Sequence, residues 1–310
     1  MVKNFGIIGY SNENGHPYSF SSIINGYNKD ELINSGWSVI YDYLKIRDIS
    51  EFGLRNCKVS HVWTQDKLIS EQIAKSCNIN HVVDHFEEML DKVDAVIIAR
   101  DDYESHLSIA TPFLEKGIKV FIDKPLTLRL DELKFFRPYL TNNLLFSTSS
   151  MRYARELDGL RADTNNLNEI ITIQTSVLND WNKYGIHMID AILSFCKIPP
   201  YSVEFKKGKH DMYIVRFQND LIWTINVLGK NASKTFSIQV LTEKWNKSVE
   251  IEDNFTMFRR MLWRFNELVQ DNKMYFSSSE IVLSNIILMA GEKSRVENRE
   301  VYINEYSEIL

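Results

Sequence analysis

The chain has 310 residues and a formal net charge of −5, and 44% of its residues are hydrophobic. This length suits two domains of ordinary size, and the composition is typical of globular proteins. The sequence contains no basic tract and no apolar stretch long enough to span a bilayer, which argues against nucleic-acid and membrane partners.

The cysteines and the N-terminus indicate the expected cellular compartment. Cys57, Cys77 and Cys196 are scattered and odd in number, so they match neither a disulfide framework nor a metal motif. The first apolar run, Phe5–Gly9, indicates a strand rather than a signal peptide. We therefore expect a cytoplasmic protein that binds no metal.

Strands and helices alternate along the first half of the chain. Strands are predicted at 5–9, 59–63, 81–83, 93–99, 119–125 and 144–147, and helices at 17–25, 68–77, 86–90, 105–116 and 131–139. This alternation is typical of an α/β domain with a doubly wound parallel sheet and right-handed crossovers. We assign residues 1–148 to this domain.

The second half has a different pattern. Strands are predicted at 169–177, 201–205, 212–217, 221–227, 236–241 and 248–251, and helices at 184–195, 257–269 and 278–296. Successive strands without intervening helices are typical of a mostly antiparallel open sheet with one face covered by helices. Residues 149–310 are thus predicted to form an α+β domain, whose last helix is a candidate for packing on the first domain.

The end of one predicted strand carries the most informative residues. Lys119–Ile122 leads directly into Asp123-Lys124-Pro125. Ligands of open parallel sheets bind beyond the carboxyl ends of the strands. Because proline fixes the next backbone angle, Lys124 is well placed to contact a ligand. The alternative is an ordinary surface lysine.

Several segments together resemble the glucose–fructose oxidoreductase, inositol dehydrogenase and MocA (Gfo/Idh/MocA) family of NAD(P)-dependent oxidoreductases. They are Gly6-Ile7-Ile8-Gly9, Asp94 to Ala99, His106, Asp123-Lys124-Pro125 and Gly185-Ile186-His187-Met188-Ile189-Asp190. The resemblance implies a Rossmann domain followed by a substrate and oligomerisation domain, and a homodimer or homotetramer. It also implies hydride transfer at a CH–OH group of a sugar, sugar nucleotide or related polyol.

Two other readings remain open on the same scaffold. One is a catalytically degenerate binding or regulatory protein, and the other is a lyase or hydrolase that uses the nicotinamide only transiently.

The resemblance implies NAD or NADP as the cofactor, held by a glycine loop. The family's Gly-x-Gly-x-x-Gly is reduced here to Gly9 and Gly15, and Asn12 and Asn14 are expected to supply the positive φ angles of the missing glycines. Thr64 stands where an acidic residue usually contacts the ribose. A neutral residue there does not repel a 2′-phosphate, and Lys67 could pair with one, so the sequence slightly favours NADP over NAD. The implied cofactor residues are Gly9, Ser11, Asn12, Gly15, His16, Thr64, Ala99, Arg100, Asp101, His106, Asp123, Lys124 and Pro125.

The resemblance also assigns catalytic residues. Lys124 is implied to hold the reacting oxygen, and His187 is implied to act as general acid and base. His187 and Asp190 are three residues apart, so we expect them to share a helix face and the carboxylate to orient the ring.

One position departs from the family's catalytic pattern. Lys183 stands where the family often has aspartate. It is expected either to bind an acidic group of the substrate or to mark a damaged proton relay. Asp180 is a candidate replacement for the missing carboxylate, and Tyr184 is a second candidate acid or base.

Two further features are left open by the sequence. Arg100 is expected either to bind a phosphate or anionic substrate or to be a solvated loop cation. The long connection Tyr27–Lys58, with Trp37 and Tyr41, is expected to be either a lid over the substrate or a packed extra hairpin or oligomer contact.

Overall fold

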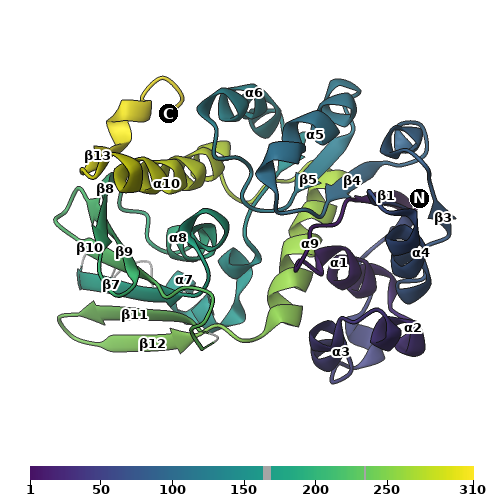
Figure 1. The fold of residues 1–310 in the computed structure, drawn as a ribbon, viewed down its shortest axis with the longest axis horizontal. Helices are drawn as coiled ribbons and strands as arrows, with labels where there is room; N and C mark the ends of the chain where they lie inside the picture. Colours follow the sequence, from purple (N-terminus) through teal and green to yellow (C-terminus); the bar gives the residue numbers. More distant parts are fainter. Residues whose placement is uncertain (163–168, 234) are drawn as a thin grey trace. The chain divides into compact units, whose positions relative to one another are not determined.

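The structure is a computed structural model that describes residues 1–162, 169–233 and 235–310. The chain forms two compact units (Figure 1). The first comprises Met1–Thr127, Phe135–Thr148 and Phe258–Ser277, and the second comprises Leu128–Lys134, Ser149–Met257 and Ser278–Leu310. Most of the penultimate helix, α9 (Asn254–Asp271), belongs to the first unit, and Ser278–Leu310 belongs to the second.

Six parallel strands form the sheet of the first unit, in the order β3-β2-β1-β4-β5-β6. They are β1 (Lys3–Ile8), β2 (Cys57–Trp63), β3 (His81–Val82), β4 (Ala95–Ile98), β5 (Lys119–Ile122) and β6 (Leu145–Phe146). The strand order reverses at the β1–β4 pair, so the loops after these two strands lie at the topological switch point. The predicted doubly wound sheet is confirmed.

The helices of the first unit follow the predicted pattern closely. They are α1 (His16–Asn25), α4 (Lys67–Ser76), η2 (Phe86–Met89), η3 (Tyr103–Ser105), α5 (His106–Glu115) and α6 (Leu130–Thr141), whose first residues belong to the second unit. Phe265 of α9 packs against Phe5, Phe121 and Phe146 of the sheet, with ring centroids 5.5–5.8 Å apart. These aromatic contacts fix α9 to the sheet of this unit.

The connection after α1 is helical. It contains α2 (Lys29–Asn34), α3 (Ser38–Leu44) and the 3₁₀ turn η1 (Ile49–Glu51). Asn28 starts α2 by accepting the N–H groups of Asp30 and Glu31, and Gly36, at φ +83°, separates the two helices. The connection is therefore built from short helices, which its local capping selects, and its role as a lid or an oligomer contact stays a prediction.

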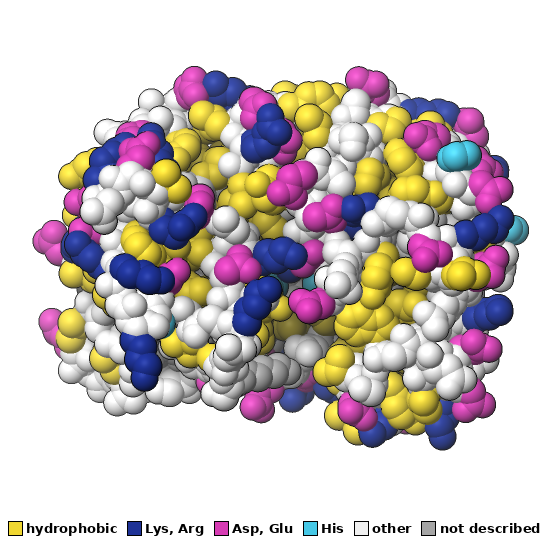
Figure 2. All heavy atoms as spheres, in the orientation of Figure 1, with side chains coloured by type: hydrophobic (Ala, Val, Ile, Leu, Met, Phe, Trp, Pro, Cys, Tyr) yellow, Lys and Arg dark blue, Asp and Glu magenta, His cyan; other side chains and the backbone are white. Residues whose placement is uncertain are grey.

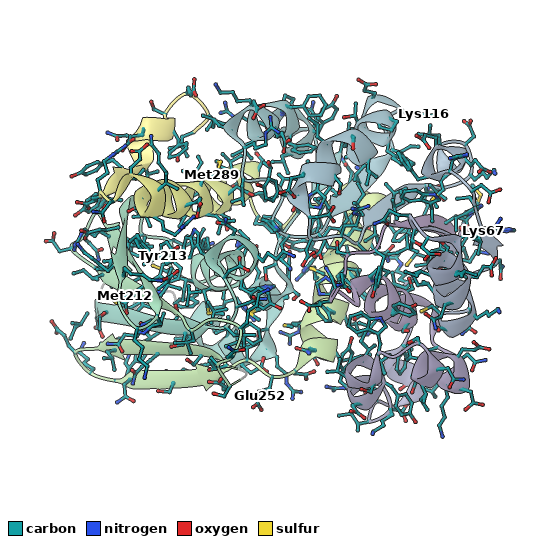
Figure 3. All side chains as sticks on the ribbon, viewed as in Figure 1. Lys67, Lys116, Met212, Tyr213, Glu252 and Met289 are labelled. Atoms are coloured by element: carbon teal, nitrogen blue, oxygen red, sulfur yellow. The ribbon has the colours of Figure 1, made fainter. Side chains whose placement is uncertain are left out.

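Seven strands form the sheet of the second unit, in the order β12-β11-β7-β10-β9-β8-β13. They are β7 (Ile170–Val177), β8 (Pro200–Lys207), β9 (Asp211–Phe217), β10 (Ile222–Val227), β11 (Phe236–Thr242), β12 (Asn246–Glu250) and β13 (Val301–Tyr302). Among the described strands of this sheet, only β7 and β10 pair in parallel, which confirms the predicted mostly antiparallel sheet. Adjacent residues point to opposite faces, and Tyr213 is buried while Met212 is not (Figure 3).

Helical segments cover one face of this sheet. They are η4 (Ser150–Tyr153), η5 (Arg155–Leu157), α7 (Asp158–Ala162), the π-helical turn η7 (Trp181–Gly185), α8 (Ile186–Leu193), α10 (Ser278–Glu297) and η8 (Ile303–Tyr306). Trp181 stacks on Tyr213 at 3.8 Å and donates its Nε1–H to the Leu288 carbonyl of α10. The indole thereby joins η7, the sheet and α10.

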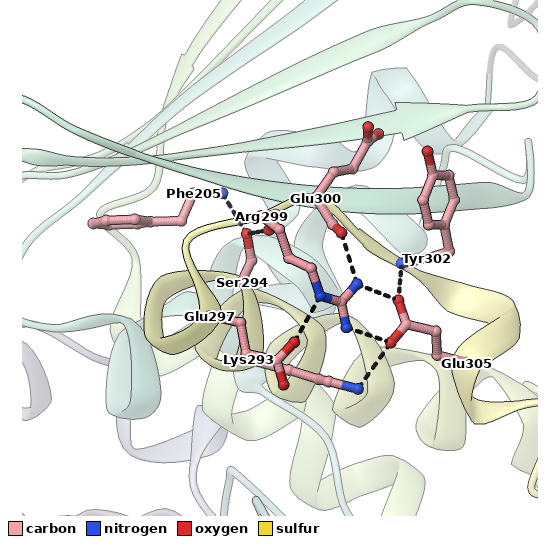
Figure 4. Close-up of polar contacts among 8 residues, drawn as sticks. All are labelled: Phe205, Lys293, Ser294, Glu297, Arg299, Glu300, Tyr302 and Glu305. Atoms are coloured by element: carbon pink, nitrogen blue, oxygen red, sulfur yellow. Dashed lines mark hydrogen bonds and ion pairs between the residues drawn. The ribbon is translucent and has the colours of Figure 1, made fainter.

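The C-terminal segment is held by a charged network around Arg299 (Figure 4). Its guanidinium donates to both carboxylate oxygens of Glu305, at 2.8 and 2.7 Å, and to Glu297 at 2.7 Å. Lys293 of α10 donates to the same Glu305 at 2.8 Å. This network ties η8 to the end of α10.

The face of the molecule seen in Figure 2 shows no single dominant charge. Acidic and basic side chains are interspersed over the face seen in Figure 2. Within the described part of the chain, no helix has the length and apolarity that a membrane span requires. In the same residues, no group of three histidine, cysteine or acidic side chains is arranged to hold a metal ion.

Candidate functional site

The first candidate cluster lies at the carboxyl ends of β1, β4 and β5 and is called the Lys124 cluster. Asp123 is buried, and its Oδ2 lies 2.5 Å from Nδ1 of His16 and 3.3 Å from the amide nitrogen of Asn14. Lys124 is also buried, with Nζ 4.0 Å from Oδ2 of Asp101. The Lys124–Pro125 bond is cis. The cluster thus contains Asn14, His16, Asp101, Asp123 and Lys124.

Asp123 is the electrostatic centre of this cluster. Burial opposes its ionisation, but the charges of His16 and Lys124 and its hydrogen bonds bring the pKa of Asp123 down to about 2. A buried carboxylate therefore stays charged and anchors the β5 loop to the start of α1.

We expect Asp123→Asn to destabilise the protein by about 2 kcal/mol at neutral pH. The folded-state pKa lies below the usual 3.8, so the carboxylate stabilises the fold above about pH 4. That contribution is lost as the pH falls through about 2, so the difference between wild type and variant should shrink in acid. Urea unfolding at neutral pH and near pH 3 measures both. The matched control is Asp84→Asn, which removes an exposed partner of Lys67 and should change little. Equal stability of wild type and Asp123→Asn at neutral pH would contradict this role.

The glycine loop adopts a tight turn after β1. Gly9 has φ +85°, and a Cβ there would lie 2.2 Å from the Arg100 side chain, so only glycine fits. The Asn14 N–H donates to the Ser11 carbonyl at 3.1 Å, and the left-handed residue of this turn is Glu13, at φ +63°. The expectation that Asn12 and Asn14 adopt positive φ is therefore wrong, because the turn places Glu13 at that position.

Arg100 lies over Gly9 and pairs with Asp102. Ser11 also donates its hydroxyl to Asp102, at 2.7 Å. Burial opposes ionisation of Asp102, but these hydrogen bonds bring its pKa down to about 2. Arg100 is 14% exposed, so the solvated-cation alternative is wrong, and an anion bound here would compete with Asp102.

The loop fits the diphosphate of a dinucleotide. It offers a turn with no Cβ at Gly9, an N-cap at Gly15 without a side-chain cap, and Arg100 beside them. Some of its backbone donors are engaged within the chain. Tyr10 donates its N–H to Gln65, and His16 donates its N–H to Asn14. A bound diphosphate would have to compete with such internal bonds.

The residues after β2 do not support the lean to NADP. Thr64 is buried, and its hydroxyl donates to the Asp66 carbonyl at 2.6 Å, so it faces the interior rather than a ribose. Lys67 pairs with Asp84 at 2.8 Å, but both side chains are exposed, so this pair is weak. The Thr64 hydroxyl is engaged within the chain, and the preference for NADP stays a prediction.

His106 and Ala99 position the loops. His106 is fully buried, and its two ring nitrogens lie 3.0 Å from the carbonyls of Leu126 and Arg100. The backbone N–H of buried Ala99 donates to Ile8. His106 thus braces the loops after β4 and β5 rather than presenting its ring to a cofactor.

Trp37 packs against the glycine loop. A Cβ on Gly15 would lie 2.7 Å from its ring, and the ring also meets those of Tyr10 and Tyr18. Tyr41, in contrast, packs on Tyr27 of the same connection. The connection therefore supports the glycine loop through the side chain of Trp37.

We expect Trp37→Ala to weaken dinucleotide binding roughly tenfold, a loss of about 1.4 kcal/mol, because the loop loses its packing. Calorimetric titration measures this. Tyr41→Ala is the control within the same connection and should leave binding unchanged. Unchanged binding by Trp37→Ala with reduced stability would mean that the connection only packs the unit.

The second cluster lies in the second unit at the start of α8 and is called the His187 cluster. His187 is 8% exposed, and its Nδ1 lies 2.6 Å from Oγ of Ser149. Its ring meets those of Tyr184 and Phe236 edge-on, at 5.3 and 6.0 Å. Phe236 also lines a hollow of about 250 Å³ together with Thr235, Glu250, Ile251 and Glu252.

Ser149 joins His187 to Asp190. The Ser149 N–H donates to Oδ2 of Asp190 at 2.5 Å, and Ser284 donates its hydroxyl to Oδ1 at 2.7 Å. Burial raises the pKa of Asp190, although the nearby charge of Arg152 lowers it. The expected direct orientation of the ring by Asp190 is corrected to an arrangement in which Ser149 contacts both.

The residues around Lys183 belong to a helical turn. Asp180 caps η7 by accepting the Lys183 N–H at 3.0 Å, so its carboxylate starts the turn. Lys183 is exposed, while Tyr184 is half-buried beside His187. π-helical turns are rare and occur frequently at functional sites.

Sequence reasoning missed three side chains that matter here. Gln65 holds both backbone groups of Tyr10, Asp102 pairs with Arg100, and Ser149 contacts His187. The only sequence signal is the run Ser147-Thr148-Ser149-Ser150 at the unit boundary. All four residues are buried, unlike a typical serine-rich loop.

Comparisons with known proteins agree with this architecture. The sequence model of the family described as "Oxidoreductase family, NAD-binding Rossmann fold" (GFO_IDH_MocA) matches residues 40–136. The match includes Lys124 and begins after the glycine loop. No curated protein sequence matches the chain.

Solved structures share the fold over nearly the whole chain. A probable dehydrogenase from Thermotoga maritima has 13% identity and a TM-score of 0.75, covering 98% of this chain and 99% of its own. Myo-inositol dehydrogenase from Lactobacillus casei, solved with NAD(H) and myo-inositol, has 14% identity and a TM-score of 0.75, covering 98% and 97%. Myo-inositol 2-dehydrogenase from Lactobacillus plantarum has 14% identity and a TM-score of 0.76, covering 97% and 99%.

Residues 40–136 thus match a model of the Gfo/Idh/MocA oxidoreductases, and the whole chain shares its fold with the solved dehydrogenases.

Proposed function

We propose that the protein is an NAD(P)-dependent dehydrogenase or reductase that acts on a CH–OH group of a sugar or polyol. The observation that carries this proposal is Lys124 at the carboxyl end of β5, within the segment that matches an NAD-binding family. NAD(P), when bound, supplies the hydride-transfer chemistry.

Each cluster is given a role in this proposal. The buried Lys124 ammonium would hold the reacting oxygen, with Asp101 as its carboxylate neighbour. Arg100 and the turn at Gly9 would hold the diphosphate. His187 is proposed to act on the reacting oxygen from the start of α8, with Tyr184 beside it.

The proposed substrate class is a polyol or sugar. Myo-inositol is the molecule bound in one structure with the same fold, which supports testing inositols first. Lys183 is exposed near His187, so an acidic group on the substrate remains part of the proposal. A homodimer or homotetramer is proposed by analogy with the family alone.

A second candidate function is a binding protein without turnover. The glycine loop favours it, because several backbone donors of the loop are bonded within the chain and the family match starts beyond it.

The test is a turnover assay with NAD and with NADP against myo-inositol, scyllo-inositol and a panel of sugars. Growth of the reduced-nicotinamide absorbance, dependent on both cofactor and polyol, is expected. Dinucleotide binding without turnover on any substrate would favour the second candidate.

A further inference from the structure

Ser149 is held by hydrogen bonds of both its side chain and its backbone in the interior of the second unit. It is fully buried at the start of η4. Its Oγ accepts the Met151 N–H at 3.2 Å and lies 2.6 Å from Nδ1 of His187. Its own N–H donates to Asp190, which fixes the serine backbone beside the histidine.

The hydroxyl proton of Ser149 needs an acceptor. The Met151 N–H can only donate, so it occupies one of the two oxygen lone pairs. Among the described residues, the acceptor within reach of the hydroxyl proton is Nδ1 of His187. If Nδ1 itself carried a proton, two donors would point at Oγ, and a hydroxyl buried away from water would lose its acceptor.

We infer that Ser149 donates its hydroxyl proton to Nδ1 and thereby fixes neutral His187 as the tautomer that is protonated on Nε2. Ser149 is then a positioning residue for His187. Asp190 acts one step further away by holding the Ser149 backbone, and the rings of Tyr184 and Phe236 confine the imidazole.

The catalytic consequence rests on the proposed function. A neutral ring protonated on Nε2 meets the reacting oxygen as a hydrogen-bond donor and cannot accept a proton at that nitrogen. His187 would thus orient and polarise the oxygen, in the manner of a neutral imidazole electrophile, and the proton that this oxygen gains or loses would pass from or to Lys124. This replaces the general-base role that the family resemblance implies for the resting state.

Nitrogen-15 NMR of the full chain, labelled at its 7 histidines, tests the inference without cofactor or substrate. The His187 signals are assigned by their loss in His187→Gln. At about pH 8, where ordinary histidines are neutral, we expect Nδ1 at the shift of an unprotonated ring nitrogen and Nε2 at that of a protonated one. Ser149→Ala should move both nitrogen shifts toward the average of the two tautomers. Ser149→Thr keeps a hydroxyl at this position and should retain the wild-type shifts.

Ser202→Ala is the matched control, because it removes another fully buried hydroxyl, one that bonds Glu300. It should leave the His187 signals unchanged. A protonated Nδ1 in the wild type, or an unchanged tautomer in a folded Ser149→Ala, would overturn the inference. Because the readout needs no turnover, a fixed tautomer in a protein without dehydrogenase activity would refute the proposed function alone.

Discussion

Lys124→Met is expected to lower turnover by about 10²–10⁴-fold while changing the dissociation constant for the dinucleotide only slightly. The ammonium is buried at the carboxyl end of β5, 4.0 Å from Asp101, where a ligand of a doubly wound sheet binds. Methionine keeps much of the side-chain volume and removes the charge, so the oxygen-holding role is lost. Steady-state kinetics and calorimetric titration separate the two effects.

Two measurements keep this result interpretable. Lys119→Met is the matched control, because Lys119 begins the same strand and donates to Asn143 and Asn272 at the opposite end. It should leave turnover unchanged. Thermal unfolding checks that the variant is folded, since removing Lys124 leaves the Asp101 carboxylate without this cation. A folded Lys124→Met protein with near-normal turnover would remove Lys124 from the proposed chemistry.

Trp181→Ala is expected to destabilise the second unit by about 3–5 kcal/mol. The indole stacks on Tyr213, bonds the Leu288 carbonyl and fills the space beside Gly185 and Gly291. A Cβ on Gly291 would lie 2.4 Å from the ring, which shows how closely α10 approaches it. Since Trp181 begins the turn that leads to His187, its loss should also broaden the His187 NMR signals.

Trp181→Phe separates packing from the hydrogen bond. It retains a ring against Tyr213 and loses the Nε1–H donor, so we expect a smaller loss of about 1–3 kcal/mol. Urea unfolding measures both variants. If Trp181→Ala were no less stable than Trp181→Phe, the indole would not be the link that joins η7, the sheet and α10.

Most of the fold could be predicted because its signals are local. The apolar runs of β4 and β5, the helix between them and Gly117 are patterns within a few residues, and the structure places these elements as predicted. The strands of the second half could be predicted equally well, because they follow one another without intervening helices. The helical connection after α1 is harder to predict, because its helices are short and their start depends on the side-chain cap of Asn28.

The candidate site depends on contacts between residues far apart in the chain, so its details could not be predicted. Glu13 adopts the left-handed φ angle because of its position in the turn at 11–14. Lys67 is paired because the fold brings Asp84 beside it. The link between Ser149 and His187 spans 38 positions. The roles of Lys124 and His187 therefore stay predictions, and the residues that contact them emerge only from the fold.

A calorimetric titration of the purified protein with NADH and with NADPH, after removal of any carried-over cofactor, tests the central claim most directly. We expect saturable binding of at least one dinucleotide with one site per chain, because the turn at Gly9, Arg100 and the start of α1 are proposed to hold the diphosphate. No binding of either would contradict the proposed dehydrogenase function and leave the chain as a protein that shares the fold of these dehydrogenases without binding a dinucleotide.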